Sequence, residues 1–229
     1  MEVLIVSKTH MSNAACVGGL VLSSNRYVRL LNPGNYNQLT DTDFDVGDIY
    51  DITFTNRTNI HPPHIEDVII SSKTFVRRVD NMPNFLTQRN IIDWNGHINN
   101  LFGGLLSWTN SGTGYIPLGG QMPAKSVGFW IADKDLLRVS FENNKVRFRY
   151  PNGTNYRNIS YVGYQDTLAT IPAGTILRVS LSRIFPPENS EITAPCGYYL
   201  QLSGWYQGGQ QANQPNRQPI VDIDDDLLF

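Results

Sequence analysis

Short runs of apolar and β-branched residues alternate with polar positions along most of the chain, and Gly, Pro and Asn separate the runs. This period-two alternation is typical of β-strands with one buried face. In the first third it predicts strands at residues 3–7, 17–22, 27–31, 49–55 and 68–76. The segment Ser23-Ser24-Asn25 suits a tight turn between two of them, because Asn tolerates a positive φ. Five strands in so short a segment predict a small barrel over residues 1–80.

The same alternation returns in the second half of the chain. It predicts strands at residues 128–132, 137–142, 145–150, 156–162, 176–182 and 198–204, and hence a second small barrel over residues 127–206. Between the barrels, residues 84–107 place apolar side chains near one face of a helix, but Asn95-Gly96 interrupts them. We therefore expect two short helices, followed by a Gly-, Thr- and Asn-rich loop at 108–126, within a connection that spans residues 81–126. The predicted fold class is all-β, with two tandem barrels, a short helical insertion and a disordered C-terminal tail.

The composition changes abruptly after Tyr206. Residues 207–219 contain Gln, Gly, Asn and Pro but no large apolar residue, which predicts a flexible linker. Residues 220–229 combine acidic and apolar side chains and end in Phe229. The last 23 residues carry a net charge of −3, so the rest of this chain of 229 residues and net charge −2 carries +1. Residues 143–183 carry +5 and residues 41–51 contain five Asp residues and no cation, so the charge is strongly polarised.

The predicted strand at 145–150 places cations and apolar residues on opposite faces. Lys145, Arg147 and Arg149 share one face, while Val146, Phe148 and Tyr150 share the other. An exposed row of cations can follow a phosphate backbone, and nearby Tyr rings can stack on bases. The candidate nucleic-acid-binding residues are Lys145, Arg147, Arg149, Tyr150, Tyr156, Arg157 and Arg178. The alternative is an ordinary solvated strand whose Tyr residues are half-buried in the core.

Several N-terminal motifs together resemble a known family. They are the segments 3–10, Cys16-Val-Gly-Gly19, 27–31, 44–51 and Pro62-Pro-His-Ile-Glu-Asp67, in that order, and the basic hairpin near residues 145–156 follows. In this order they resemble the dual oligonucleotide-binding (OB) fold domain family of bacteria. Phe75 stands where that family usually has a Trp. The resemblance covers about residues 1–205 and implies two five-stranded barrels and nucleic-acid binding, often in defence against foreign genomes such as those of phages.

The C-terminal segment resembles the acidic tip of bacterial single-stranded DNA-binding proteins. A Gln/Gly linker, an acidic triplet and a terminal Phe occur in the same order, although Leu227-Leu228 replaces the usual Ile-Pro. A terminal aromatic ring can fill an apolar pocket while the carboxylates meet Arg and Lys around it. The resemblance implies docking onto DNA replication or repair enzymes. The candidate partner-binding residues are Asp222, Asp224, Asp225, Asp226, Leu227, Leu228 and Phe229.

The sequence thus predicts a non-enzymatic protein that binds single-stranded DNA or RNA and recruits replication or repair enzymes through its tip. Two alternatives remain open: a decoy or interaction module that acts through the tip alone, and an accessory or sensor subunit of a bacterial defence system. We expect no cofactor and no membrane contact, and the absence of a signal peptide and of long apolar runs predicts a cytoplasmic location. His61 and His64 lack further ligands for a metal. We expect His64, Glu66 and Asp67 to form a polar cluster with Lys8 or His10.

Overall fold

The computed structural model describes residues 1–140, 145–186 and 194–207, and almost all of its regular structure is β. The described chain divides into two compact units. The first contains Met1–Ile91, Gly163–Asp166 and Tyr206, and the second contains Ile92–Val162 and Thr167–Trp205. The predicted linker and tip residues from 208 onward lie outside the described part.

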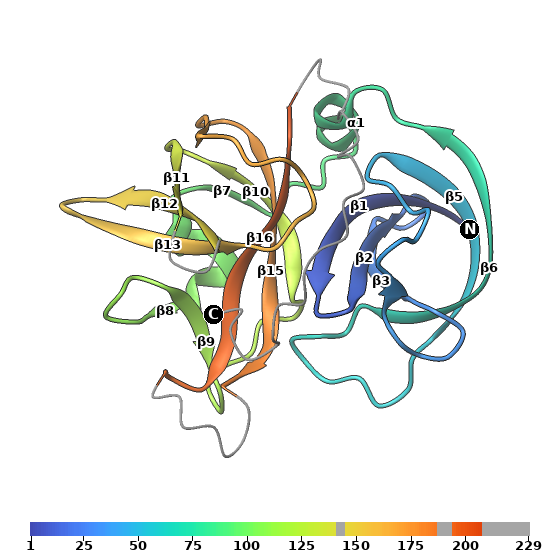
Figure 1. Ribbon diagram of the computed structural model, residues 1–229, viewed down its shortest axis with the longest axis horizontal. Coiled ribbons are helices and arrows are strands. Elements are labelled where there is room, and N and C mark those ends of the chain that lie inside the picture. The colour runs from blue at the N-terminus through green and yellow to red at the C-terminus, as the bar shows by residue number, and fades with distance from the viewer. Residues whose placement is uncertain (141–144, 187–193, 208–229) are drawn as a thin grey trace. The chain divides into compact units, whose positions relative to one another are not determined.

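The strands of the first unit are β1 (Glu2–Met11), β2 (Ala14–Val21), β3 (Arg26–Leu31), β4 (Gln38–Leu39), β5 (Asp48–Asn56) and β6 (Asp67–Arg78). Five of them close into a barrel in the order β1-β2-β3-β6-β5 and back to β1 (Figure 1). All these pairs are antiparallel except β3–β6, which is parallel. This is the five-stranded Greek-key barrel predicted from the sequence. The expected turn is also present, since Asn25 has a φ of 56° and its N–H donates to Val21 O at 2.8 Å.

The core of the first barrel follows from the alternation that predicted its strands. In β5, Ile52 is fully buried between the exposed Asp51 and Thr53, and its side chain joins Val3, Val17, Leu30 and Val68 inside the barrel. One apolar side chain from every second position is enough to fill a barrel of this size. In β1 and β2, by contrast, five consecutive residues are buried, so the outward side chains of these strands are covered as well.

The second unit repeats the same strand order with one interruption. Its barrel strands are β10 (Val127–Ala132), β11 (Leu136–Ser140), β12 (Val146–Asn152), β13 (Asn155–Tyr161), β15 (Ile176–Phe185) and β16 (Gly197–Tyr206). The ladder runs β11-β12-β13-β16-β15-β10, with β13–β16 parallel. The end strands β10 and β11 are consecutive in the chain and only residues 133–135 separate them. Together they therefore take the place of one long first strand, so the sheet has the OB order with its first strand broken. Among the described strands no ladder joins β10 to β11, and this second barrel is a half-barrel, whereas the first is closed.

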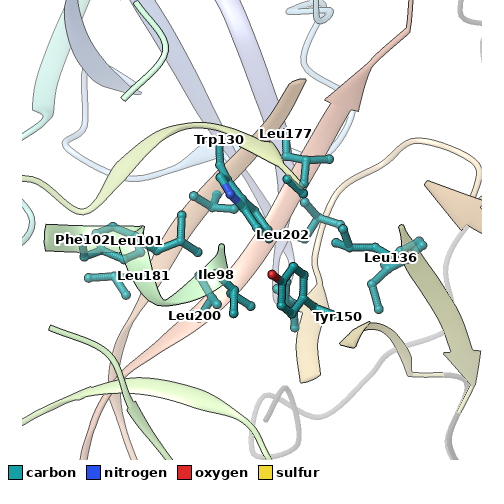
Figure 2. Close-up of a cluster of buried hydrophobic side chains, with 14 of the residues drawn as sticks. Ile98, Leu101, Phe102, Trp130, Leu136, Tyr150, Leu177, Leu181, Leu200 and Leu202 are labelled. Atoms are coloured by element: carbon teal, nitrogen blue, oxygen red, sulfur yellow. The ribbon is translucent and has the colours of Figure 1, made fainter. Parts of the chain in front are cut away.

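The core of the second barrel is larger and more aromatic than that of the first. Trp130, Phe148, Leu177 and Leu200 are fully buried, and Trp205 is nearly so. Figure 2 shows Trp130, Tyr150, Leu177 and Leu202 directed toward one another from different strands. Ile98, Leu101 and Phe102 also enter this core from the segment that precedes the barrel.

The connection between the barrels differs from the prediction in detail. It contains α1 (Met82–Gln88), β7 (Trp94–Gly96), the 3-10 helix η1 (Ile98–Gly104), β8 (Ser107–Trp108) and β9 (Gly114–Pro117), and β14 (Thr170–Ile171) occurs later. The two short helical elements agree with the expected break at Asn95-Gly96. The expected loop at 108–126 is instead partly a β-hairpin, because β8 pairs with β9 and β9 pairs with β16. Among the described helices, none has the length and hydropathy needed to cross a membrane.

Candidate nucleic-acid interface

The hairpin β12–β13 carries most of the predicted binding residues. Gly153 and Thr154 form its turn, where Gly153 adopts a φ of +63°, and Asn152 before the turn pairs with Asn155 after it. Burial alternates along β12, because Phe148 and Tyr150 are fully buried while Arg147 and Arg149 are half-buried. The hairpin therefore has one core face and one outer face, as the sequence predicted.

The row of cations lies on the outer face. Arg147 and Arg149 are two residues apart on one strand, so their Cα atoms lie about 6.6 Å apart, and Lys145 precedes them. Burial lowers the pKa of Arg147, and burial together with the charge of Arg147 lowers the pKa of Lys145. Both shifts show that solvent is partly excluded from this face, and the shift of Lys145 also shows the repulsion between the two neighbouring cations. Such a row gains stability when an anion neutralises it.

Two of the predicted binding residues are corrected by the structure. Tyr150 is completely buried, and its hydroxyl donates to Asp133 Oδ1 at 2.7 Å, so its ring is part of the core. Arg178 is 1% exposed on β15, a strand with neighbours on both sides, and its guanidinium lies 4.8 Å from the Phe129 ring centroid. Because a ligand outside the barrel cannot reach buried side chains, neither residue belongs to the interface.

Tyr156 and Arg157 are accessible at the start of β13. Tyr156 is 47% exposed, and the Arg149 guanidinium lies 5.5 Å from its ring centroid. Arg157 is half-buried, and its guanidinium lies 4.3 Å from the Trp108 ring centroid. Each cation thus lies against an aromatic ring, which restricts its conformations.

A pocket of about 350 Å³ opens beside these residues. Arg149, Tyr156 and Arg157 line one part of it, so the structure brings together three of the predicted residues. The rest of the lining consists of Thr109, Asn110, Ser111, Gly112, Asn155 and Asn158. All of these lie in the second unit, and the lining is mostly polar, which suits a charged ligand.

The wall opposite β13 is the turn that joins β8 to β9. Gly112 N–H donates to Thr109 O at 2.9 Å, and the Ser111 hydroxyl lies 3.0 Å from that of Thr109. The turn is fastened to β13 by two bonds, Asn158 N to Gly112 O at 2.8 Å and Asn158 Nδ2 to Ser111 O at 2.5 Å. Gly112 has a φ of +79°, and a Cβ atom there would overlap Tyr156 O. Only Gly allows the turn to approach the strand this closely.

This second wall of the pocket was not predicted from the sequence. The run Thr109-Asn-Ser-Gly-Thr113 is a strong turn signal, yet a turn signal does not reveal which strand the turn contacts. Asn158 and Trp108 were missed for the same reason, since their roles depend on contacts between segments far apart in the chain. Their chemistry is visible only in the folded protein.

The polar cluster expected in the first unit has different partners. Asp67 is 2% exposed and accepts from Arg29 Nε at 2.5 Å, Arg29 Nη2 at 2.6 Å and Arg57 Nη1 at 2.9 Å. Lys8 and His10 lie elsewhere: Lys8 donates to Thr42 O, and His10 stacks on Tyr164 with 3.8 Å between ring centroids. The Arg29–Asp67–Arg57 network lies at the parallel β3–β6 pair and stabilises the barrel closure. In the described ranges, no three His, Cys, Asp or Glu side chains are grouped as a metal site would require.

The fold and this face together define the class of protein. It has two tandem OB-type barrels, and the second barrel carries a basic outer face. The sequence comparison assigns the family: the chain belongs to the dual OB-containing domain family, whose model matches residues 1–205. A search of the curated proteins gives no match.

Two solved structures resemble the chain loosely. One is the crystal structure of the p204 HINb domain, with 14% identity, 88% of this chain and 95% of that chain covered, and a TM-score of 0.33. Another is a murine DNA-binding protein bound to double-stranded DNA, with 10% identity, 92% and 98% coverage, and a TM-score of 0.31. Likenesses at this level identify neither a shared site nor a shared ligand.

Proposed function

We propose that the protein binds single-stranded nucleic acid on the outer face of β12–β13, without catalysing a reaction. The observation that carries the proposal is the row Lys145, Arg147 and Arg149 beside the exposed ring of Tyr156. In the OB order, β12 and β13 are the second and third strands, the part of this barrel that commonly receives oligonucleotides. Cations for phosphates and a ring for bases are the combination that suits single strands.

A salt titration tests the proposal. Binding of labelled oligo-dT and oligo-rU is measured for the wild type and for the triple variant Lys145→Ala, Arg147→Ala, Arg149→Ala. Each phosphate contact with a single strand contributes about −0.7 to the slope of log affinity against log salt, so the triple variant should lose about two units of slope. The ratio of the wild-type affinity to the affinity of the triple variant should therefore fall roughly 20-fold between about 50 and 200 mM salt. Absence of wild-type binding to both oligonucleotides at low salt would refute the proposal.

We further propose that the tip recruits a replication or repair enzyme. What supports this is the sequence alone, namely the acidic residues from Asp222 to Asp226 and the apolar end at Phe229. The test is a pull-down with a free C-terminus, in which Phe229→Ala should abolish capture of the partner and Gln207→Ala, in the linker, should not. Equal capture by Phe229→Ala would contradict the role of the tip.

The acidic tip should also compete with nucleic acid for the basic face. Removal of residues 220–229 is then expected to tighten oligonucleotide binding at low salt, and the gain should vanish at high salt because salt screens the attraction. Anisotropy titrations of the full chain and the shortened chain measure this difference. Identical low-salt affinities would exclude the competition without affecting the binding face.

A further inference from the structure

The pocket between β13 and the 109–112 turn combines three kinds of ligand-binding group. It contains two cationic side chains, an exposed aromatic ring and several hydroxyl and amide groups. Its volume of about 350 Å³ lies near the lower end of the range for small-molecule sites, roughly 300–1,000 Å³. A plain phosphate-tracking surface needs cations alone, so this combination indicates a more selective ligand.

The two cations come from one hairpin and line one pocket. Arg149 lies against Tyr156, and Arg157 lies against Trp108. With its amide oxygen turned toward the guanidinium, Asn152 also accepts from Arg157 Nε and Nη2 at 3.3 Å each. Their side chains leave opposite faces of the hairpin, because Arg149 pairs with Asn158 whereas Arg157 pairs with the buried Tyr150. The face of Arg149 also holds Tyr156 and Asn158, and the planar donors of its guanidinium match the oxygens of a phosphate.

Asn158 provides an independent sign of a ligand. The residue is 8% exposed and lines the pocket, and its Nδ2 donates a hydrogen bond to Ser111 O. Its Oδ1 has no hydrogen-bond partner within the described chain. A buried acceptor without a donor is costly, and an incoming hydroxyl or amino group removes that cost. The pocket therefore favours a ligand that carries donors as well as a phosphate.

We propose that this pocket binds one nucleotide as a unit, with its phosphate at Arg149, its base on Tyr156 and a sugar or base donor at Asn158. The proposal rests on the proposed function in that it places one nucleotide of a bound strand in this pocket. It also goes further, because a nucleoside monophosphate free in solution has all three groups and should bind there on its own.

Two glycines offer a charge-neutral test of the pocket. Gly112→Ala places a Cβ against Tyr156 O and separates the turn from β13, which removes the pocket without changing any charge. Gly119→Ala is the matched control, because Gly119 has a φ of +80° and nothing within 4 Å of its added Cβ. Both variants carry the same backbone strain, so a difference between them reports the pocket. Arg149→Gln is the second pocket variant, since it removes one charge and leaves the turn intact.

The experiment measures equilibrium binding of adenosine 5′-monophosphate, adenosine and inorganic phosphate to the full chain by calorimetry. We expect one monophosphate per chain for the wild type and Gly119→Ala. Gly112→Ala and Arg149→Gln should bind it at least roughly tenfold more weakly, about the loss of one charged hydrogen bond. Lys145→Ala, outside the pocket, should weaken oligonucleotide binding but leave the monophosphate affinity unchanged.

The controls separate the possible failures. If inorganic phosphate binds as tightly as the monophosphate, the site is a simple anion site. If adenosine binds as tightly as the monophosphate, the phosphate makes no contact that contributes to binding. Either result overturns the proposal. Unchanged monophosphate binding in both pocket variants would place the ligand elsewhere and overturn it too. If oligonucleotides bind and the monophosphate does not, the pocket proposal fails while the proposed function stands. If only the monophosphate binds, the pocket stands and the proposed function fails.

Discussion

Replacement of Tyr156 by Ala separates stacking from electrostatic attraction at the proposed interface. The ring is 47% exposed, and the Arg149 guanidinium lies 5.5 Å from its centroid, so one ring face is left for a base. Stacking of a base on an aromatic side chain is worth about 1–3 kcal/mol by alanine substitution. With one open face we expect the lower part of this range, about 1–2 kcal/mol, which corresponds to a roughly 5- to 30-fold loss of affinity.

The loss should be the same at every salt concentration, because a neutral ring releases no counterions when a strand binds. Anisotropy titrations of Tyr156→Ala with oligo-dT at several salt concentrations should give a parallel line below that of the wild type. Arg149→Ala should instead give a slope about 0.7 units shallower. Tyr156→Phe should retain the wild-type affinity, since the ring is kept.

Tyr36→Ala is the matched control for this experiment. Tyr36 is 73% exposed and belongs to the first unit, so its loss removes an exposed ring that is not part of the unit that contains β12 and β13. The reasoning is refuted if Tyr36→Ala weakens binding as much as Tyr156→Ala does. It is also refuted if Tyr156→Ala changes the slope and leaves the affinity at high salt unchanged.

Two further predictions concern the stability of the first barrel, measured by urea unfolding. Asp67→Asn should lower the free energy of unfolding by about 3–5 kcal/mol, because Arg29 and Arg57 lose the buried carboxylate that neutralises them. Asp43→Asn is the control at the exposed ion pair with Lys73, and it should lower the free energy of unfolding by less than about 1 kcal/mol. Burial lowers the pKa of His10, so the folded state binds fewer protons there than the unfolded state. The free energy of unfolding is therefore unaffected by His10 above the unfolded pKa of about 6.5 and falls as the pH drops below it. His10→Phe, which cannot take up a proton, should lose less stability between about pH 7.5 and 5.5 than the wild type.

The strands and their faces could be predicted because they depend on local alternation. The period of two placed Phe148 toward the core and Arg149 away from it, and the structure agrees. The same pattern had already put Tyr150 on the apolar face, so its burial follows from the sequence even though we considered it as a ligand-binding residue. Period-two patterns are reliable here because a one-residue shift of register would expose the whole apolar face.

The rest of the site could not be predicted because it depends on which segments cover which strands. Arg178 lies on β15, which has β10 and β16 as neighbours and is buried along most of its length. A single cation in an apolar strand looks the same in sequence whether its strand is central or at an edge. The turn at 109–112 presents the same difficulty, since its contact with β13 joins residues more than 40 positions apart.

The two barrels share a strand order but differ in the face that could receive a ligand. In the first barrel the second and third strands are β2 and β3, and their outward side chains Leu20 and Tyr27 are buried like their inward ones. Arg29 is engaged by Asp67, which leaves Arg26 as the one exposed cation among the described residues of these two strands. In the second barrel the corresponding strands keep a half-exposed row of cations. Arg26→Ala should therefore leave oligonucleotide affinity within about twofold of the wild type, as expected for a cation that makes no phosphate contact. A loss as large as that of Arg149→Ala in the same titration would move the interface to the first barrel.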